Sequence, residues 1–282
     1  MEDLTPLIGV HYAMDLLLKE VDRICKKHNI QYYLWGGTLL GAVRHNDFIP
    51  WDDDVDVTFK RPDYEKFCEI APKELGENFQ LVMPGEDNRY FDMIPKLNYV
   101  PSRIHNPCED DEFYYGKHNK VSLDVFCADT PCKGFMFKLQ LLRLKQVYGY
   151  AMGHRRELVM SDYSGITKLY VKAFSIVGKM MSMDTINKKY KRVSTWGRSD
   201  DNYFISNDRI MFAHLQFSKK WLEDTAEYPI RDNMYTATKY ADDYLTYVYK
   251  DYMKLPPEEK RLPEHTGRLN EIEVYDSEGN KI

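Results

Sequence analysis

An acidic run that leads into an apolar strand is the feature that most constrains how this chain folds. The run Ile49-Pro-Trp-Asp-Asp-Asp-Val-Asp-Val57 alternates acids with valines at its end. Successive side chains of a strand face opposite sides, so we expect Asp52, Asp54 and Asp56 on one side and the two valines on the buried side. Unpaired carboxylates are costly to bury beside core residues. The pattern therefore predicts that a cation lies among these acids.

A third carboxylate is expected from another apolar strand. Asp124 is a lone acid within the run Val121-Ser-Leu-Asp-Val-Phe126. Oxygen ligands without histidine or cysteine favour Mg²⁺ or Mn²⁺. We therefore predict that Asp54, Asp56 and Asp124 are the catalytic residues and that they hold the metal. An acidic cluster on its own is more often a solvated loop, which is the alternative interpretation.

A glycine pair just upstream predicts a phosphate-binding turn. Gly36-Gly37 follows an apolar segment, residues 30–35, and precedes a short predicted helix over 38–44. Glycine lets backbone N–H groups approach a phosphate closely, and a helix N-terminus adds positive potential. A plain turn is the alternative interpretation of the pair. The predicted substrate-binding residues are Gly36, Gly37, Thr38, Arg44, His45 and Lys96, with Thr38 also a candidate helix cap.

Hydrophobic periodicity predicts a mixed α/β (α+β) architecture. The expected helices cover residues 7–28, 38–44, 62–75 and 237–253, and the expected strands cover 30–35, 55–59, 79–83, 93–100 and 121–127. Further helices are expected from Lys133 onward. Because the sequence shows no internal repeat or clear linker, we predict one domain over residues 1–282 with a basic helical insertion at about 133–200.

Positive charge is concentrated in one segment of an otherwise acidic chain. The net charge is −5, yet residues 133–192 contain 13 lysines and arginines against three acids. A local patch of this kind argues against a general nucleic-acid binder and makes an anionic membrane surface a candidate partner. Within it, residues 166–181 place apolar side chains on one helix face and lysines off that face. This helix is expected either to pack on the core or to lie on a membrane.

Cysteine usage and hydropathy set expectations for the compartment. Five cysteines lack a CxxC pair and a zinc-site spacing, which predicts free thiols; they are Cys25, Cys68, Cys108, Cys127 and Cys132. The first residues lack a signal-peptide pattern, and no apolar run reaches the length of a membrane span. The expected location is cytoplasmic, with peripheral contact to the inner face of the plasma membrane as a candidate addition.

The segment from Tyr32 to Thr58 resembles the signature of the LicD family, which is related to fukutin and fukutin-related protein. The matching runs are Gly-Gly-Thr-Leu-Leu-Gly-Ala-Val-Arg-His45 and Ile-Pro-Trp-Asp-Asp-Asp-Val-Asp56. A later run, Asp251-Tyr-Met-Lys-Leu-Pro-Pro-Glu-Glu-Lys-Arg261, is similar to the closing motif of the family. The chain departs from the family at Asn46-Asp47, where members often have Gly-Gly, and at Glu264-His265, where a histidine pair is common.

This resemblance implies a nucleotidyltransferase-like mixed sheet flanked by helices, with a helical elaboration. It implies transfer of phosphocholine, ribitol phosphate or a similar group from a CDP-linked donor to a hydroxyl of a cell-surface glycan precursor or lipid-linked oligosaccharide, releasing CMP. In bacteria such acceptors belong to lipopolysaccharide, teichoic acid or capsule. By this resemblance Gly36 and Gly37 fall on the donor phosphate loop, and Asp54 and Asp56 on the metal pair. Asp124 then either completes the metal site or accepts the hydroxyl proton.

Two other functions remain open from the residues alone. Transfer of a nucleotidyl group from ATP or CTP to a small molecule, sugar or protein uses the same acids and releases pyrophosphate. A non-enzymatic glycan- or membrane-binding protein needs neither acids nor metal. The tyrosine-rich runs Tyr114-Tyr115 and residues 244–252 are expected to pack in the fold, with a cage for a quaternary ammonium group as the alternative.

Overall fold

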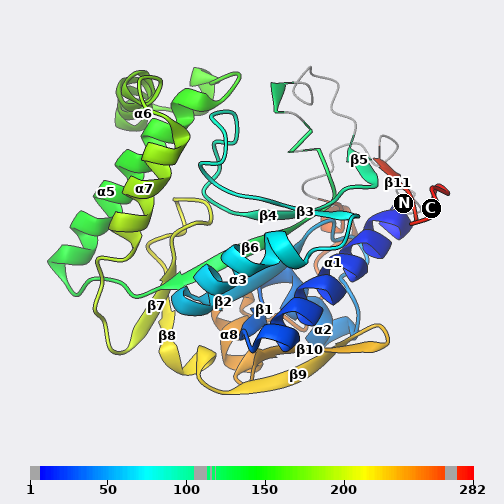
Figure 1. Cartoon of the computed structure of the whole chain (residues 1–282). Coiled ribbons are helices and arrows are strands. Elements are labelled where there is room, and N and C mark those ends of the chain that lie inside the picture. The colour runs from blue at the N-terminus through cyan, green and yellow to red at the C-terminus, as the bar shows by residue number, and fades with distance from the viewer. Residues whose placement is uncertain (1–6, 105–112, 115, 118, 264–271) are drawn as a thin grey trace.

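The computed structural model describes residues 7–104, 113–114, 116–117, 119–263 and 272–282. Cys108, Tyr115, Glu264 and His265 lie outside the described residues. The described chain forms a mixed α/β fold, as predicted, with a seven-stranded sheet at its centre and helices around it (Figure 1).

The central sheet has the strand order β1-β2-β6-β4-β3, with β7 paired to the end of β6 and β8 paired to β7. Its strands are β1 (Tyr32–Leu34), β2 (Val55–Lys60), β3 (Phe79–Val82), β4 (Lys96–Tyr99), β6 (Ser122–Asp129), β7 (Asn202–Ile205) and β8 (Gln216–Ser218). Strands β2 and β6 run parallel, whereas the other pairs are antiparallel. The strands predicted around residues 55, 79, 96 and 122 are confirmed.

Opposite faces of β2 carry the core and the candidate site. Val55, Val57 and Phe59 are fully buried, and the Phe59 ring stacks on Phe67 of α3 (Arg61–Glu74) at 4.9 Å between centroids. Asp56 points the other way, as alternation along a strand requires. There it meets the first turn of α2 (Gly36–His45). Helices α2 and α3 therefore lie on opposite faces of the sheet.

Helix α1 (Leu7–His28) spans the residues that its periodicity predicts. Its apolar stripe is buried in the main core, where it contacts β4 and β6 and also α3. The buried stripe includes Val10, Met14, Leu17, Val21 and Ile24. The wide apolar face explains why this helix can be predicted from sequence, since helical stability in proteins comes mainly from packing such a face.

The predicted helix over 237–253 is wrong at its start. Ala237 and Thr238 belong to strand β10 (Asn233–Thr238), which forms a hairpin with β9 (Thr225–Ile230) and contacts β1. Helix α8 (Ala241–Tyr249) begins only after this strand. Pairing with β9 satisfies the backbone of these residues, and burial of Ala237 and of Tyr235 stabilises the strand. A second small sheet pairs β5 (Ser102–Ile104) with β11 (Ile272–Val274).

The basic segment forms a helical group beside the sheet, at the left of Figure 1. It contains α5 (Phe135–Ala151), α6 (Gly165–Gly178) and α7 (Met183–Ser194), and α5 contacts both other helices. A separate cluster of buried side chains, among them Leu144 and Ile186, holds α5 and α7 together. Of the two alternatives for α6, packing of the whole apolar face on the core is wrong, because Ile166, Leu169 and Met180 are strongly exposed.

Within the described ranges, no helix combines the length and the apolar character needed to cross a bilayer. The four cysteines among the described residues, Cys25, Cys68, Cys127 and Cys132, are free thiols, as predicted.

Candidate active site

Three charged residues lie in a row across neighbouring strands. In the parallel pair β2 and β6, Asp56 is opposite Asp124, and in the antiparallel pair β6 and β4, Asp124 is opposite Lys96. The Lys96 Nζ atom lies 3.0 Å from Asp124 Oδ1. Because partners in register project from the same face of a sheet, the pairing brings these three predicted site residues together.

The remaining acids lie in the turn that leads into β2. The strand begins at Val55, so Asp52, Asp53 and Asp54 precede it, after a turn in which the Asp52 N–H donates to the Ile49 carbonyl at 2.9 Å. Carboxylate oxygens of these three residues lie within 4.8 Å of one another. This group shares only Asp54 with the predicted metal ligands Asp54, Asp56 and Asp124, because residues 52–54 form a turn before the strand begins. It adds Asp53, which is buried, to the acids considered from sequence.

The acids are crowded enough to change the protonation of Asp56. Burial raises the pKa of Asp56 well above its usual value, and repulsion from Asp54 and Asp124 raises it further. Lys96 counters only part of this charge. Burial lowers the pKa of Lys96, but attraction to Asp124, Asp92 and Asp54 together outweighs it and raises the pKa overall. Excess carboxylate charge with oxygen donors alone is the donor set that a hard divalent cation fits.

The glycine pair lets the first turn of α2 approach these acids. Helix α2 begins at Gly36, whose φ of +52° is a conformation that glycine adopts readily. A Cβ atom on Gly36 would lie 2.8 Å from Asp56 Oδ2, and one on Gly37 would lie 2.9 Å from Asp52 Oδ2. A Cβ at either glycine would therefore force the neighbouring carboxylate to shift, and the predicted loop lies directly beside the predicted acids.

Hydrogen bonds fix this turn against β2 and α8. The Asp56 N–H donates to Thr38 Oγ1 at 2.8 Å, and the Gly36 N–H donates to the Tyr244 hydroxyl at 3.1 Å. Trp35, not Thr38, is the N-cap residue, so the prediction that Thr38 caps the helix is wrong. The Thr38 hydroxyl instead links α2 to β2 by accepting the hydrogen bond from the Asp56 N–H. Tyr244 is buried beneath the turn, and sequence analysis assigned it no role there.

Arg44 and His45 lie in the last turn of α2, about 12 Å along the helix from Gly36 at 1.5 Å per residue. Arg44 Nη1 donates to the Tyr252 carbonyl at 2.8 Å, and Arg44 Nε lies 3.0 Å from His45 Nε2. The structure therefore places both predicted substrate-binding residues away from the glycine turn, with Arg44 against the C-terminal segment and His45 beside Arg44 and Trp51.

Asp208 is a site residue that sequence analysis missed. Its neighbour Asn207 is buried and bonds to the β6 backbone, accepting from the Cys127 N–H and donating to the Val125 carbonyl, each at 3.0 Å. Burial raises the pKa of Asp208, and repulsion from Asp124 adds to the shift. The signal in the sequence was an acid three residues after strand β7 (Asn202–Ile205), a strand that the apolar pattern alone did not reveal.

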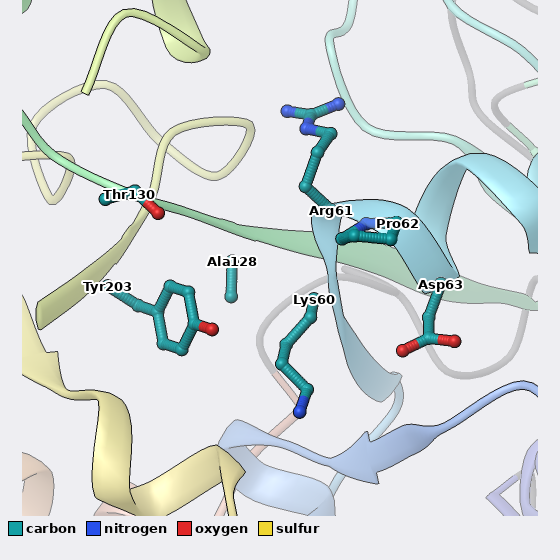
Figure 2. A pocket seen from close by; sticks show the side chains of 7 residues that line it. All are labelled: Lys60, Arg61, Pro62, Asp63, Ala128, Thr130 and Tyr203. Carbon is teal, nitrogen blue, oxygen red and sulfur yellow. The ribbon is translucent and has the colours of Figure 1, made fainter. Parts of the chain in front are cut away.

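The structure also contains a hollow that is separate from the acids. It has a volume of about 460 Å³ and is lined by Lys60, Ala128 and Tyr203 among others (Figure 2). Lys60 and Ala128 are partners at the carboxyl ends of β2 and β6, so the hollow lies about 13 Å along the strands from Asp56. In Figure 2 the Arg61 guanidinium points away from Lys60. It pairs with buried Asp129 instead.

Comparison with known proteins places the acids within a recognised domain. Residues 29–138 match the family described as LicD/FKTN/FKRP, nucleotidyltransferase domain. The lipopolysaccharide cholinephosphotransferase LicD of Haemophilus influenzae is 26% identical over 260 residues, which cover 86% of this chain and 89% of that protein.

Two further relatives match shorter parts. The uncharacterized protein RP689 of Rickettsia prowazekii is 42% identical over 176 residues, covering 62% of this chain and 52% of its own length. The human ribitol 5-phosphate transferase FKRP is 64% identical over 47 residues, which are 17% of this chain and 10% of FKRP. The domain match includes Gly36, Asp56, Lys96 and Asp124. Through residues 29–138, the chain is therefore similar to the LicD/FKTN/FKRP nucleotidyltransferase domain.

Proposed function

We propose that this protein is a phosphotransferase that moves a phospho-substituent, such as phosphocholine or ribitol phosphate, from a CDP-linked donor to a glycan hydroxyl. The observation that carries the proposal is the row of Asp56, Asp124 and Lys96 beside the glycine turn of α2. The names of the relatives support it, since one is a cholinephosphotransferase and another a ribitol 5-phosphate transferase. The acceptor class is a cell-surface glycan precursor of the lipopolysaccharide, teichoic acid or capsule type, carried on a lipid or free.

Asp54, Asp56 and Asp124 are the residues that would hold Mg²⁺ or Mn²⁺, with Asp52 close by at Gly37. A cation held there would neutralise charge on the donor diphosphate and would stabilise the leaving phosphate of CMP. The metal is assigned to this cluster because its carboxylates repel one another, which raises the pKa of Asp56, and because oxygen donors alone suit a hard divalent cation.

The side chains themselves position the reactants. The first turn of α2 directs its N-terminus toward the acids, a geometry that favours a phosphate group there. Lys96 holds the carboxylate of Asp124 in place and adds a positive charge to the row. The acceptor oxygen bonds to the distal phosphorus while the bond to the CMP oxygen breaks. The hydroxyl proton passes to a carboxylate of the cluster, for which Asp124 and Asp208 are the two candidates.

Isothermal titration tests the proposal most directly. The protein is titrated with CDP-choline, CDP-ribitol, CTP and ATP, each with and without Mg²⁺. We expect metal-dependent binding of one CDP-linked donor, and release of CMP when a glycan acceptor is added. The Asp56→Asn variant should lose turnover while keeping its fold, and Asp232→Asn, an exposed acid in the β9–β10 turn, is the matched control.

The same experiment distinguishes the second candidate, nucleotidyl transfer, which the shared acid row also favours. Preference for CTP or ATP, with pyrophosphate as the product, would replace the proposal. Full turnover by Asp56→Asn would refute both reactions at this site.

A further inference from the structure

Helix α6 exposes its most apolar side. Four of its apolar side chains, Ile166, Leu169, Ile176 and Val177, lie within an arc of about 100°, given 100° per residue, and Met180 follows in the turn two residues past the helix. The exposed fractions are 84% for Ile166, 70% for Leu169, 58% for Ile176, 44% for Val177 and 86% for Met180. We call these five residues the α6 stripe. A contiguous apolar surface of this kind on a folded protein marks an interaction site more often than chance exposure does.

The orientation of the α6 stripe is fixed by the opposite side of the helix. Val171, Ser175 and Gly178 are buried against α5 and the turn that follows it. A Cβ on Gly178 would lie only 1.9 Å from the Tyr150 carbonyl oxygen, and one on Gly149 only 2.8 Å from the Cβ of Phe174. Such close backbone contact holds α6 in one rotation, so the stripe cannot turn inward without breaking the contact with α5.

Lysines border the α6 stripe on one flank. Lys168, Lys172 and Lys179 are exposed and fall between the stripe and the buried side of the helix. Among the described residues, no acidic side chain forms an ion pair with any of the three. The surrounding segment, residues 133–192, carries a net charge of +10. Long lysine side chains beside an apolar stripe are the arrangement that places ammonium groups at lipid phosphates while apolar groups enter the acyl region.

We propose that the α6 stripe and its three lysines form a docking surface for a membrane that contains anionic lipid. The charge favours this occupant over a second copy of the chain, because two copies facing each other through this segment would bring two strongly positive surfaces together. The proposal is independent of the transfer reaction, since it rests on residues outside the acid row. It assigns to the helical group a role in holding the enzyme at a lipid surface.

Co-sedimentation of the full chain with lipid vesicles tests this surface. The probes are vesicles of phosphatidylcholine alone and vesicles with about one third phosphatidylglycerol. Two double variants separate the two forces: Ile166→Glu with Leu169→Glu removes the apolar contact, and Lys168→Glu with Lys172→Glu reverses the charge. Met234→Glu in β10, which is also an exposed apolar residue, is the matched control.

We expect the wild-type protein and the control to bind the anionic vesicles. Each double variant should bind at least about tenfold more weakly, given the free energy of burying two aliphatic side chains or of placing two lysines at an anionic surface. Equal binding to neutral and anionic vesicles, or unchanged binding by either double variant, would overturn the proposal. A wild-type dimer in analytical ultracentrifugation that Ile166→Glu with Leu169→Glu converts to monomer would also overturn it, by assigning the stripe to self-association.

Discussion

The ammonium group of Lys96 lies 3.0 Å from Oδ1 of Asp124, with the two residues opposite each other on adjacent antiparallel strands. In the row of Asp56, Asp124 and Lys96, the lysine places a positive charge directly beside the two acids.

Replacing Lys96 with methionine should lower kcat for CMP release roughly 100-fold, the scale seen when one preorganised electrostatic group is removed from an active site. The reason is that Asp124 loses its partner and the row gains negative charge. Steady-state kinetics with a saturating CDP-linked donor measures the effect. Lys60→Met, at the carboxyl end of β2, is the control and should retain full activity. Equal rates for the two variants would remove Lys96 from the site.

Gly36→Ala should abolish activity and destabilise the protein by about 1 kcal/mol or more, because a Cβ would meet the Asp56 carboxylate in a left-handed backbone conformation. Gly134→Ala is a close control. Gly134 has a similar φ of +54°, but an added Cβ there would have no heavy atom within 4 Å. Urea denaturation and turnover assays of both variants therefore separate backbone strain from contact with Asp56. Loss of activity in both would point to strain alone.

Asp208→Asn should weaken Mg²⁺ binding by about 10- to 100-fold, as expected when a group next to the ligands is neutralised. Asp208 interacts electrostatically with Asp56 and Asp124, so its removal reduces the negative potential that attracts the cation. Calorimetric titration with Mg²⁺ measures the change, with Asp232→Asn as the exposed control. Identical affinities in the two variants would show that Asp208 lies outside the metal's influence.

Stability should depend on acid pH through Glu20 of α1. Burial raises the pKa of Glu20, but hydrogen bonds from Arg23 and the Gly76 N–H outweigh it, so the folded-state pKa is lower than the usual value of 4.5. The stabilisation by Glu20 is therefore complete above the unfolded-state pKa and is lost as the pH falls through the folded-state pKa. The difference in unfolding free energy between wild type and Glu20→Gln should be constant from pH 6 to 8.

Below pH 4.5 that difference should shrink toward zero. Urea denaturation at several pH values measures it, and Glu69→Gln, on the exposed side of α3, should show no such dependence. A difference that grew on acidification would contradict the lowered pKa.

Much of the fold follows from local patterns. Helix α1 and strand β2 are predictable because their apolar periodicity is strong and their neighbours reinforce it. The hairpin of β9 and β10 is not, because its residues alternate weakly and depend on pairing with each other and on contact with β1. Helix α6 is a third case. Its apolar face is clear from the sequence, but whether that face points to the core or to solvent depends on glycine contacts with α5.

The candidate site likewise combines residues that local sequence patterns predict with residues that depend on long-range contacts. Asp56, Asp124 and the glycine turn are predictable because each breaks the pattern of the segment that contains it. The ion pair of Lys96 with Asp124 depends on strand register, and the contact of Tyr244 with Gly36 joins residues 208 positions apart. Asp208 reaches the acids only because Asn207 binds to the β6 backbone. Such long-range contacts leave no local mark in the sequence.

The strand order has a consequence for when the site comes into existence. Strand β6 lies between β2 and β4 although it follows both in the chain. Asp56 of β2 and Lys96 of β4 therefore have no common neighbour until β6 places Asp124 between them. Cation binding at these acids would therefore require a completed sheet. A measurement of metal affinity would then also measure whether the sheet has assembled correctly.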